Sequence, residues 1–292
     1  MSLIVEKAGR FVKLATRNPL RAMHVLVVLA VRRGQGMLAH IGALSGTAAS
    51  VYYLFVSNAF RREHQAVLKG KLAFRAVDKR CQVSSARLRR NTHRLEKGLI
   101  MRPRRPVFAE SYIGETVSDY QKACLGNTLD EGERIWARDV LAIYFSIVAS
   151  TPRIERARKE FESVTAPVYA PVCVPYPSST RPRSEITFHQ LEVLFRERRS
   201  TRWFEARRVP RDIIEKAVEA AALAPSACNR QPFSYAVLDQ PARAASVAKL
   251  AGGTGGFAEN IPCLIASVGD LSCYPEERDR HLIYIDASLA NM

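Results

Sequence analysis

The sequence predicts an α+β fold that follows a mostly helical, basic N-terminal region, and three observations support this prediction. Apolar residues recur at helical spacing within residues 82–160. Five prolines then crowd residues 165–184, a density that excludes a regular helix or a central strand. After them, helical patterns alternate with two short apolar runs typical of strands, Phe233–Leu238 and Cys263–Val268. We therefore expect three parts, namely a basic helical region over 1–164, a linker over 165–184 and an α+β domain over 185–292.

Two helices are expected in the first region, Ser84–Leu99 and Asp130–Val148, because both segments are rich in helix formers and carry an apolar stripe. In the first of them, His93 and Glu96 stand three residues apart on one helix face, which is half of a metal site. A helix surface that ends in a C-cap at Gly98 explains the same residues better. We therefore predict no metal site in this chain.

Capping signals place the helices of the last region. A capping box predicts a helix that starts at Thr187, because Gln190 follows three residues later. A second helix is expected to start near Pro210, whose ring suits a first turn, and Pro225 ends it. A further helix is expected over Leu282–Met292.

The composition and the cysteines exclude several classes of protein. Of the 292 residues, 47% are hydrophobic and 25% charged, which is a globular composition and not a disordered one. The six cysteines form no CxxC pair, no zinc-ligand spacing and no disulfide framework, which fits a reducing compartment. The short apolar run Val25–Val31 is followed by Arg32 and Arg33, where a secretory signal would have small residues. We expect a cytoplasmic protein, with peripheral attachment to a membrane as an alternative.

The positive charge belongs to the N-terminal region. The chain has a net charge of +16, and residues 1–105 alone hold 22 basic residues against four acidic ones. Nucleic acid, an anionic membrane surface and an acidic polymer would all satisfy such a charge. Base-reading motifs are absent, so nucleic acid is the least favoured of the three. A charged, solvated face over a packed arm explains the pattern equally well.

One stretch of this region, Gly34–Phe60, contains no Lys, Arg, Asp or Glu. A membrane-spanning helix needs about 20 apolar residues, so the stretch is long enough to span. It also contains glycine, serine, threonine, histidine and asparagine, and its hydrophobicity is modest. A buried or interfacial helix is therefore favoured over a membrane span.

Two polar blocks carry the chemistry of the chain. The first, Arg198–Arg202, clusters guanidinium groups around the Ser200 hydroxyl, which suits a phosphate dianion. The second, Ala224–Phe233, holds Ser, Asn and Gln on a turn between prolines, which suits the edge of a polar heterocycle. Each block has a simpler explanation: a solvated basic helix end for the first, and an Asx-type loop that binds its own backbone for the second.

In this order and separation, the two blocks resemble the nitroreductase family of FMN-dependent oxidoreductases. That family typically shows Arg-Arg-Ser-x-Arg-x-Phe followed by Ala-Pro-Ser-x-x-Asn-x-Gln-Pro-Trp, and here Phe233 replaces the Trp. The resemblance continues through Gly256–Pro262 and implies a nitroreductase-like FMN-binding fold over roughly the last third of the chain. A second segment, His93–Leu99, resembles a stretch upstream of this domain in some nitroreductase-related proteins of bacterial polysaccharide gene clusters.

The resemblance also assigns roles to residues. The implied FMN-binding residues are Arg198, Arg199, Ser200, Arg202, Pro225, Ser226, Asn229 and Gln231. In the family, the matching Arg-Ser-x-Arg residues contact FMN, here taken to be its phosphate, and we expect Arg198 to assist them. The second block contacts the flavin ring, often the ring bound by a partner subunit. No catalytic side chain is expected, because the flavin carries the chemistry.

The implied activity is that of an FMN-dependent oxidoreductase. NAD(P)H, as co-substrate, would give a hydride to flavin N5, and an electron-poor small molecule would collect it in a ping-pong cycle. The family also implies a homodimer. Family members continue well past Ile283–Met292, so the C-terminal part of the domain is expected to be missing. The alternative is a catalytically silent flavin-binding or scaffold protein, held at the membrane by its basic N-terminal arm.

Overall fold

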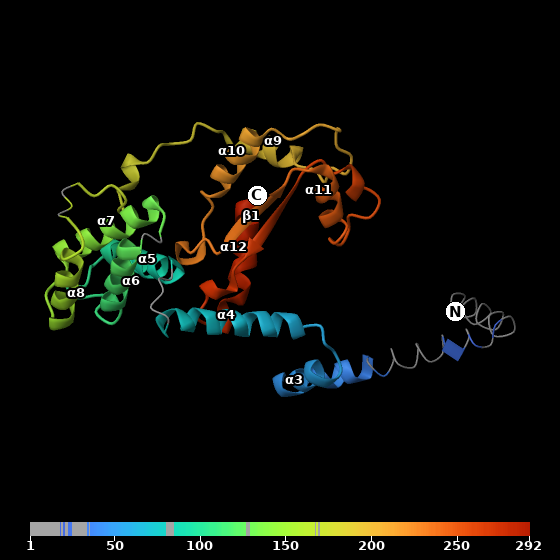
Figure 1. Cartoon of the computed structure of the whole chain (residues 1–292), viewed down its shortest axis with the longest axis horizontal. Coiled ribbons are helices and arrows are strands. Elements are labelled where there is room, and N and C mark those ends of the chain that lie inside the picture. The colour runs from blue at the N-terminus through green and yellow to red at the C-terminus, as the bar shows by residue number, and fades with distance from the viewer. Residues whose placement is uncertain are drawn as a thin grey trace. The chain divides into compact units, whose positions relative to one another are not determined.

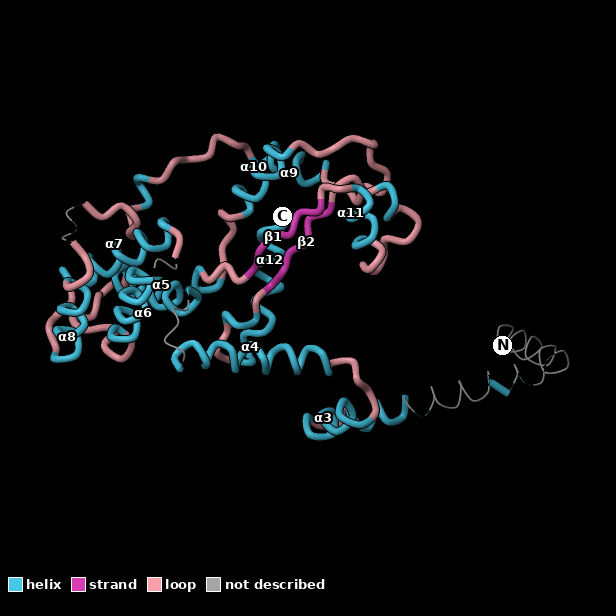
Figure 2. The backbone as a smooth tube through the Cα atoms, in the orientation of Figure 1, coloured by secondary structure: helices cyan, strands magenta, loops and turns pink. Residues whose placement is uncertain are grey.

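The computed structural model describes residues 18, 20, 23–24, 34, 36–79, 85–126, 129–166, 168 and 170–292. It divides into two compact units, Met1–Ala66 and Val67–Met292, and the division falls inside helix α4 (Arg61–Lys79). Each unit is described by itself. Figure 1 labels the elements, and Figure 2 separates helix, strand and loop.

The uncharged stretch of the first unit does not form a single helix. Residues 36–42 are helical, a turn follows, and α3 then covers Gly46–Phe55. Ser45 caps α3, because its hydroxyl accepts a hydrogen bond from the Ala48 N–H at 3.1 Å. No residue of α3 is buried, and Phe55 is 79% exposed. Among the described helices, none has the length and apolar character that crossing a membrane requires.

The exposed apolar side chains of α3 and the basic residues in the sequence of the N-terminal region lead to a prediction. We expect the full-length protein to sediment with anionic vesicles and not with neutral ones, because basic residues beside apolar side chains bind an anionic interface. Salt should weaken the binding. Removal of residues 1–60 should abolish it, while removal of residues 185–292 should not. Equal sedimentation with neutral vesicles would contradict an electrostatic attachment.

Four helices form the first hydrophobic core of the second unit: α5 (Ser85–Ile100), α6 (Ile113–Gly126), α7 (Glu131–Ile147) and α8 (Pro152–Glu162). They lie together in Figure 1. Caps define two of their starts, since the side chains of Asp130 and Thr151 accept backbone N–H bonds from Glu133 and Ile154. The fully buried side chains of this core include Leu88, Leu95, Ile113, Val117, Tyr120, Val140, Leu141, Tyr144 and Ile154.

A buried ion pair lies inside this helical core. Arg87 of α5 donates two hydrogen bonds of 2.6 Å to the Asp119 carboxylate of α6. Burial raises the pKa of Asp119, and the bonds from Arg87 oppose that shift. The pair fixes the relative register of α5 and α6, because a buried charge that loses its partner is strongly destabilising.

Gly98 plays a different role from the predicted helix cap. It lies inside α5, which continues to Ile100. A Cβ atom at this position would come within 2.4 Å of the Phe108 ring. The glycine therefore allows close packing of a loop on the helix, and the C-cap interpretation is wrong because the helix does not end there.

The Pro-rich segment begins on the helical core and then leads away from it. The Asp139 carboxylate of α7 accepts the backbone N–H groups of Val172 at 2.8 Å and Cys173 at 3.0 Å. These bonds, together with Arg138, hold the pKa of Asp139 low against the opposing effect of burial. One 3₁₀ turn, Ser178–Thr180, interrupts the otherwise irregular segment.

After this segment the structure becomes mixed. It contains α9 (Phe188–Glu197), α10 (Arg211–Ala221), β1 (Phe233–Leu238), α11 (Pro241–Ala248), β2 (Leu264–Gly269) and α12 (Leu282–Asn291), with several 3₁₀ turns. The strands β1 and β2 form a two-stranded antiparallel sheet, in which Phe233 pairs with Gly269 and Leu238 with Leu264. A second, smaller core of Ala244, Ala248, Ala258 and Ile261 lies under α11. This helix-rich architecture with a small sheet is consistent with the predicted α+β fold.

The middle of α4 contacts this mixed part. Lys71 forms an ion pair of 2.6 Å with Glu277. Gly70 lies against Leu271, whose backbone oxygen would be 2.6 Å from a Cβ atom at that position. Only a glycine therefore allows α4 to approach so closely.

Candidate functional site

The first polar block forms an exposed loop directly after α9. Residues 198–202 are all exposed. Arg199 donates through Nη1 to the Arg198 carbonyl at 3.0 Å, and Arg202 donates to the Ser200 carbonyl at 3.2 Å. No carboxylate pairs with these guanidinium groups in the described part of the chain. Their remaining N–H donors are therefore available to an anion.

Asn260 holds the backbone of this loop. Its side-chain oxygen accepts the Phe204 N–H at 2.9 Å, and its side-chain nitrogen donates to the Arg202 carbonyl at 2.8 Å. Asn260 belongs to the 3₁₀ turn Ala258–Asn260, far from the loop in sequence. Sequence reasoning placed this residue in the resembling segment but gave it no role.

Asp286 of α12 binds the second polar block. The Ser226 hydroxyl donates to Asp286 Oδ2 at 2.8 Å and accepts the Gln231 N–H at 2.8 Å. The Ala227 N–H donates to the same Asp286 oxygen at 3.0 Å. The buried Asp286 carboxylate thus holds the start of the turn, and the Ser226 hydroxyl links that start to Gln231. Ser226 therefore serves here as a structural residue of the loop.

Three residues of this loop have left-handed backbone conformations. Cys228, Asn229 and Gln231 have φ values of 56°, 51° and 47°. Such values are uncommon for residues other than glycine and cost of the order of 1–3 kcal/mol when the surroundings impose them. The surroundings that impose them come from α5, which packs against this turn.

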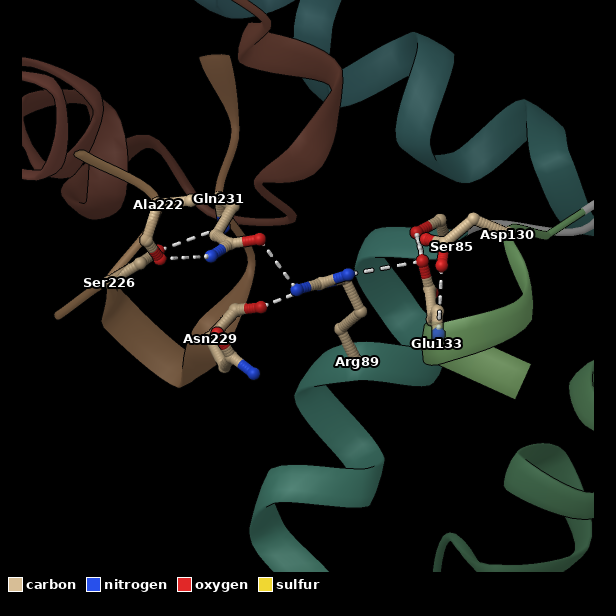
Figure 3. Close-up of polar contacts among 8 residues, drawn as sticks. All are labelled: Ser85, Arg89, Asp130, Glu133, Ala222, Ser226, Asn229 and Gln231. Atoms are coloured by element: carbon tan, nitrogen blue, oxygen red, sulfur yellow. Dashed lines mark hydrogen bonds and ion pairs between the residues drawn. The ribbon is translucent and has the colours of Figure 1, made fainter. Parts of the chain in front are cut away.

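Arg89 of α5 is the centre of that contact (Figure 3). Its Nε donates to the Asn229 carbonyl at 2.6 Å, and its Nη2 donates to Gln231 Oε1 at 2.8 Å. On the other side, Nη1 donates to Glu133 Oε2 at 3.1 Å, and the Ser85 hydroxyl donates to the same carboxylate at 2.7 Å. One guanidinium therefore joins the helical core to the loop.

The amide side chains of Gln231 and Asn229 differ in whether their hydrogen-bonding groups are already used within the chain. Gln231 is engaged at both ends, by Arg89 at its oxygen and by the Ala222 carbonyl, which accepts from its nitrogen at 3.2 Å. Asn229 uses only its backbone oxygen in the contacts that Figure 3 draws, and none of the described residues binds its side-chain amide. Of the two, Asn229 can present a free donor and acceptor to a ligand.

An apolar groove adjoins Gln231. It has a volume of about 460 Å³ and lies between α10 and β1. The apolar residues that line it include Ile214, Val218, Phe233, Tyr235 and Val237.

Different residues hold the two blocks in place. The first is held by Asn260, and the second by Asp286 and Arg89. Among the described residues, no hydrogen bond or ion pair joins one block to the other.

Metal and thiol chemistry find little support in the described residues. No cluster of three His, Cys, Asp or Glu side chains there could hold a metal ion. His93 Nδ1 lies 3.4 Å from Glu96 Oε2, and Glu96 also accepts a hydrogen bond from Trp136. Burial raises the pKa of the Cys273 thiol to about 11, with Asp270 adding to the shift, so this thiol is protonated at neutral pH.

Comparison with known proteins supports one segment of the chain. Residues 195–255, which contain both polar blocks, match the nitroreductase family. The chain is also similar to mouse iodotyrosine deiodinase 1, with 30% identity over 70 residues, which are 23% of this chain and 25% of that protein. The chain thus spans about a quarter of the length of this curated relative. No solved structure matches it significantly.

The family match does not reach His93–Leu99, so it does not support the predicted resemblance of that segment. For residues 195–255, the match agrees with the sequence motifs that resemble this family.

Proposed function

We propose that this chain is an FMN-dependent oxidoreductase that takes a hydride from NAD(P)H and passes it to an electron-poor small molecule in a ping-pong cycle. The observation that carries the proposal is the pair of polar blocks inside the segment that matches the nitroreductase family. Bound FMN would supply the hydride chemistry, and the protein would supply binding and orientation.

The residues present fit the parts of FMN. Arg199, Ser200 and Arg202 would hold the phosphate, with Arg198 beside them, because their donors are exposed and none of the described residues gives them an acidic partner. The Asn229 amide would contact the polar edge of the ring. Pro225, Ser226 and Gln231 would shape the loop, since Ser226 and Gln231 are already bound within the chain.

The proposal predicts that the protein copurifies with non-covalent FMN. Purified full-length protein should be yellow, and heat denaturation should release the flavin into solution. The measurement is flavin absorbance before and after denaturation, followed by identification of the released molecule. Colourless protein that gains no flavin band when FMN is added would contradict the proposal.

A homodimer would bring the two blocks to one flavin from two subunits. Large apolar side chains are exposed on α9, α10 and α12, namely Phe188, Leu194, Phe195, Ile213, Tyr284, Ile285 and Leu289. Such side chains favour association with a second copy.

We therefore expect a dimer in sedimentation experiments. Phe195→Asp on α9 should shift it to monomer, because a charge would enter the apolar interface. Leu250→Asp serves as the control, since Leu250 is 86% exposed and lies outside these helices. A monomer that retains flavin would contradict the dimeric arrangement but would leave the proposed flavin chemistry unaffected.

A further inference from the structure

A second group of arginines lies where α5 meets the loop of the second block. Arg90 and Arg94 are four residues apart on α5 and so share a helix face. Arg230 follows the 3₁₀ turn Ala227–Asn229, which packs against α5. Burial lowers the pKa of Arg90, and the positive charges of Arg94 and Arg230 lower it further, while Cys228 and Glu115 act in the opposite sense.

On α5, Arg87 and Arg89 are paired with buried carboxylates, whereas Arg90 and Arg94 have no acidic partner among the described residues. Arg230, outside this helix, has Asp279 at 3.6 Å. Arg87 binds Asp119, and Arg89 binds Glu133. Arg90, which is partly buried, has no hydrogen bond or ion pair in the described part of the chain.

Arg94 lacks an acidic partner among the described residues. Its guanidinium lies 3.7 Å from the centre of the Tyr112 ring and donates to the Asn91 side chain at 3.4 Å. Glu115, whose charge acts on Arg90, accepts a hydrogen bond from Asn91 at 2.8 Å and lies 3.8 Å from Arg87. Glu115 is therefore shared and does not neutralise the group.

Arg230 is buried with unused donors. Its side chain is 4% exposed, and its Nε and Nη1 atoms have no hydrogen-bond partner among the described residues. Asp279 lies 3.6 Å from Nη1, too far for a hydrogen bond, and the Tyr274 ring lies 5.1 Å from the guanidinium. Buried charged donors without partners are costly, so such a group calls for an acceptor.

We propose that Arg90, Arg94 and Arg230 form a binding site for a small oxyanion, either a carboxylate or a phosphate group. Guanidinium groups bind both through paired N–H donors, and an anion would remove the repulsion among the three positive charges. The site is built from other elements than the Arg198–Arg202 loop, because its arginines belong to α5 and to the end of the turn Ala227–Asn229, whereas that loop follows α9. It also adjoins Asn229, so an acidic small molecule bound there would lie beside the loop of the second block.

The test uses calorimetry to measure the binding of inorganic phosphate and, in a separate titration, of acetate to purified full-length protein. Every protein sample carries the two substitutions Arg199→Gln and Arg202→Gln, so that the exposed loop does not bind the anion used as probe. We expect saturable binding of at least one anion, and the stronger of the two identifies the preferred group. Arg90→Gln should weaken it at least tenfold, and Arg90→Lys should weaken it less, because the charge remains but the fork is lost.

Lys97→Gln is the matched control, because Lys97 is an exposed basic residue of the same helix. It should leave the affinity unchanged. Without anion, Arg90→Gln should melt at the same temperature as the parent or higher, which verifies that the variant folds. Absence of saturable binding, or equal weakening by Arg90→Gln and Lys97→Gln, would overturn the proposal.

Discussion

Replacement of Arg199 or Arg202 by alanine is expected to lower the affinity for FMN by about tenfold to a hundredfold each. A hydrogen bond to a charged group contributes about 1.5–3 kcal/mol, which corresponds to such a change in dissociation constant. Both guanidinium groups contact only backbone carbonyls of their own loop, so the loop can retain its fold when either is removed. The measurement is a fluorescence titration of flavin-free protein with FMN.

Two nearby arginines provide the controls for this experiment. Arg207 pairs with Glu205 at 2.8 Å, and Arg208 lies 3.7 Å from Asp239, and both side chains are largely exposed. Their alanine variants should change the affinity little, because solvent screens such charges. If all four variants lose the same affinity, general electrostatic attraction explains the binding and the phosphate site is wrong. Riboflavin, which lacks the phosphate, should bind all variants alike.

Arg89→Met is expected to destabilise the protein by about 3 kcal/mol, because removal of one partner of a buried ion pair leaves the other charge unpaired. Glu133 would lose Arg89, and the Asn229 carbonyl and the Gln231 side chain would lose their shared donor. The loop should then become more mobile. In the described chain, no other residue of α5 forms a hydrogen bond with the left-handed residues of this loop. Denaturant unfolding measures the first effect, and amide hydrogen exchange at Gln231 measures the second.

A neighbouring pair separates this effect from a general loss of charge. Arg134 pairs with Glu131 on the exposed face of α7, so Arg134→Met should change stability little. Combining Arg89→Met with Glu133→Gln should recover part of the lost stability, because the orphaned carboxylate is gone. A loss of stability as small for Arg89→Met as for Arg134→Met would contradict the central role of Arg89.

Local patterns in the sequence sufficed for several elements of the second unit, although not for α6, α8 and α11. The capping box at Thr187 and Gln190 is confirmed, with both reciprocal bonds present. The strand expected over Phe233–Leu238 is found there, and the helix expected from Asp130 begins one residue later, with Asp130 as its cap. Such features depend on neighbours within a few residues, which a single sequence contains.

The partners of the polar blocks could not be predicted, because they come from distant segments. Gln231 meets Arg89 across 142 positions, and Ser226 meets Asp286 across 60. Nothing in the repeat of arginines along α5 indicates which of them reaches the loop and which binds Asp119. The functional assignments of the eight predicted residues stay predictions, since bound FMN is needed to test them.

The contact between Arg89 and the loop also has a consequence for the order of folding during synthesis. The helices α5 to α8 pack on one another through short connections and can assemble as soon as they leave the ribosome. The loop reaches its native conformation only after Gln231 is made, and its clamp only after Asp286, close to the C-terminal end. A nascent chain halted before α12 should therefore carry a folded helical core and an unformed second block.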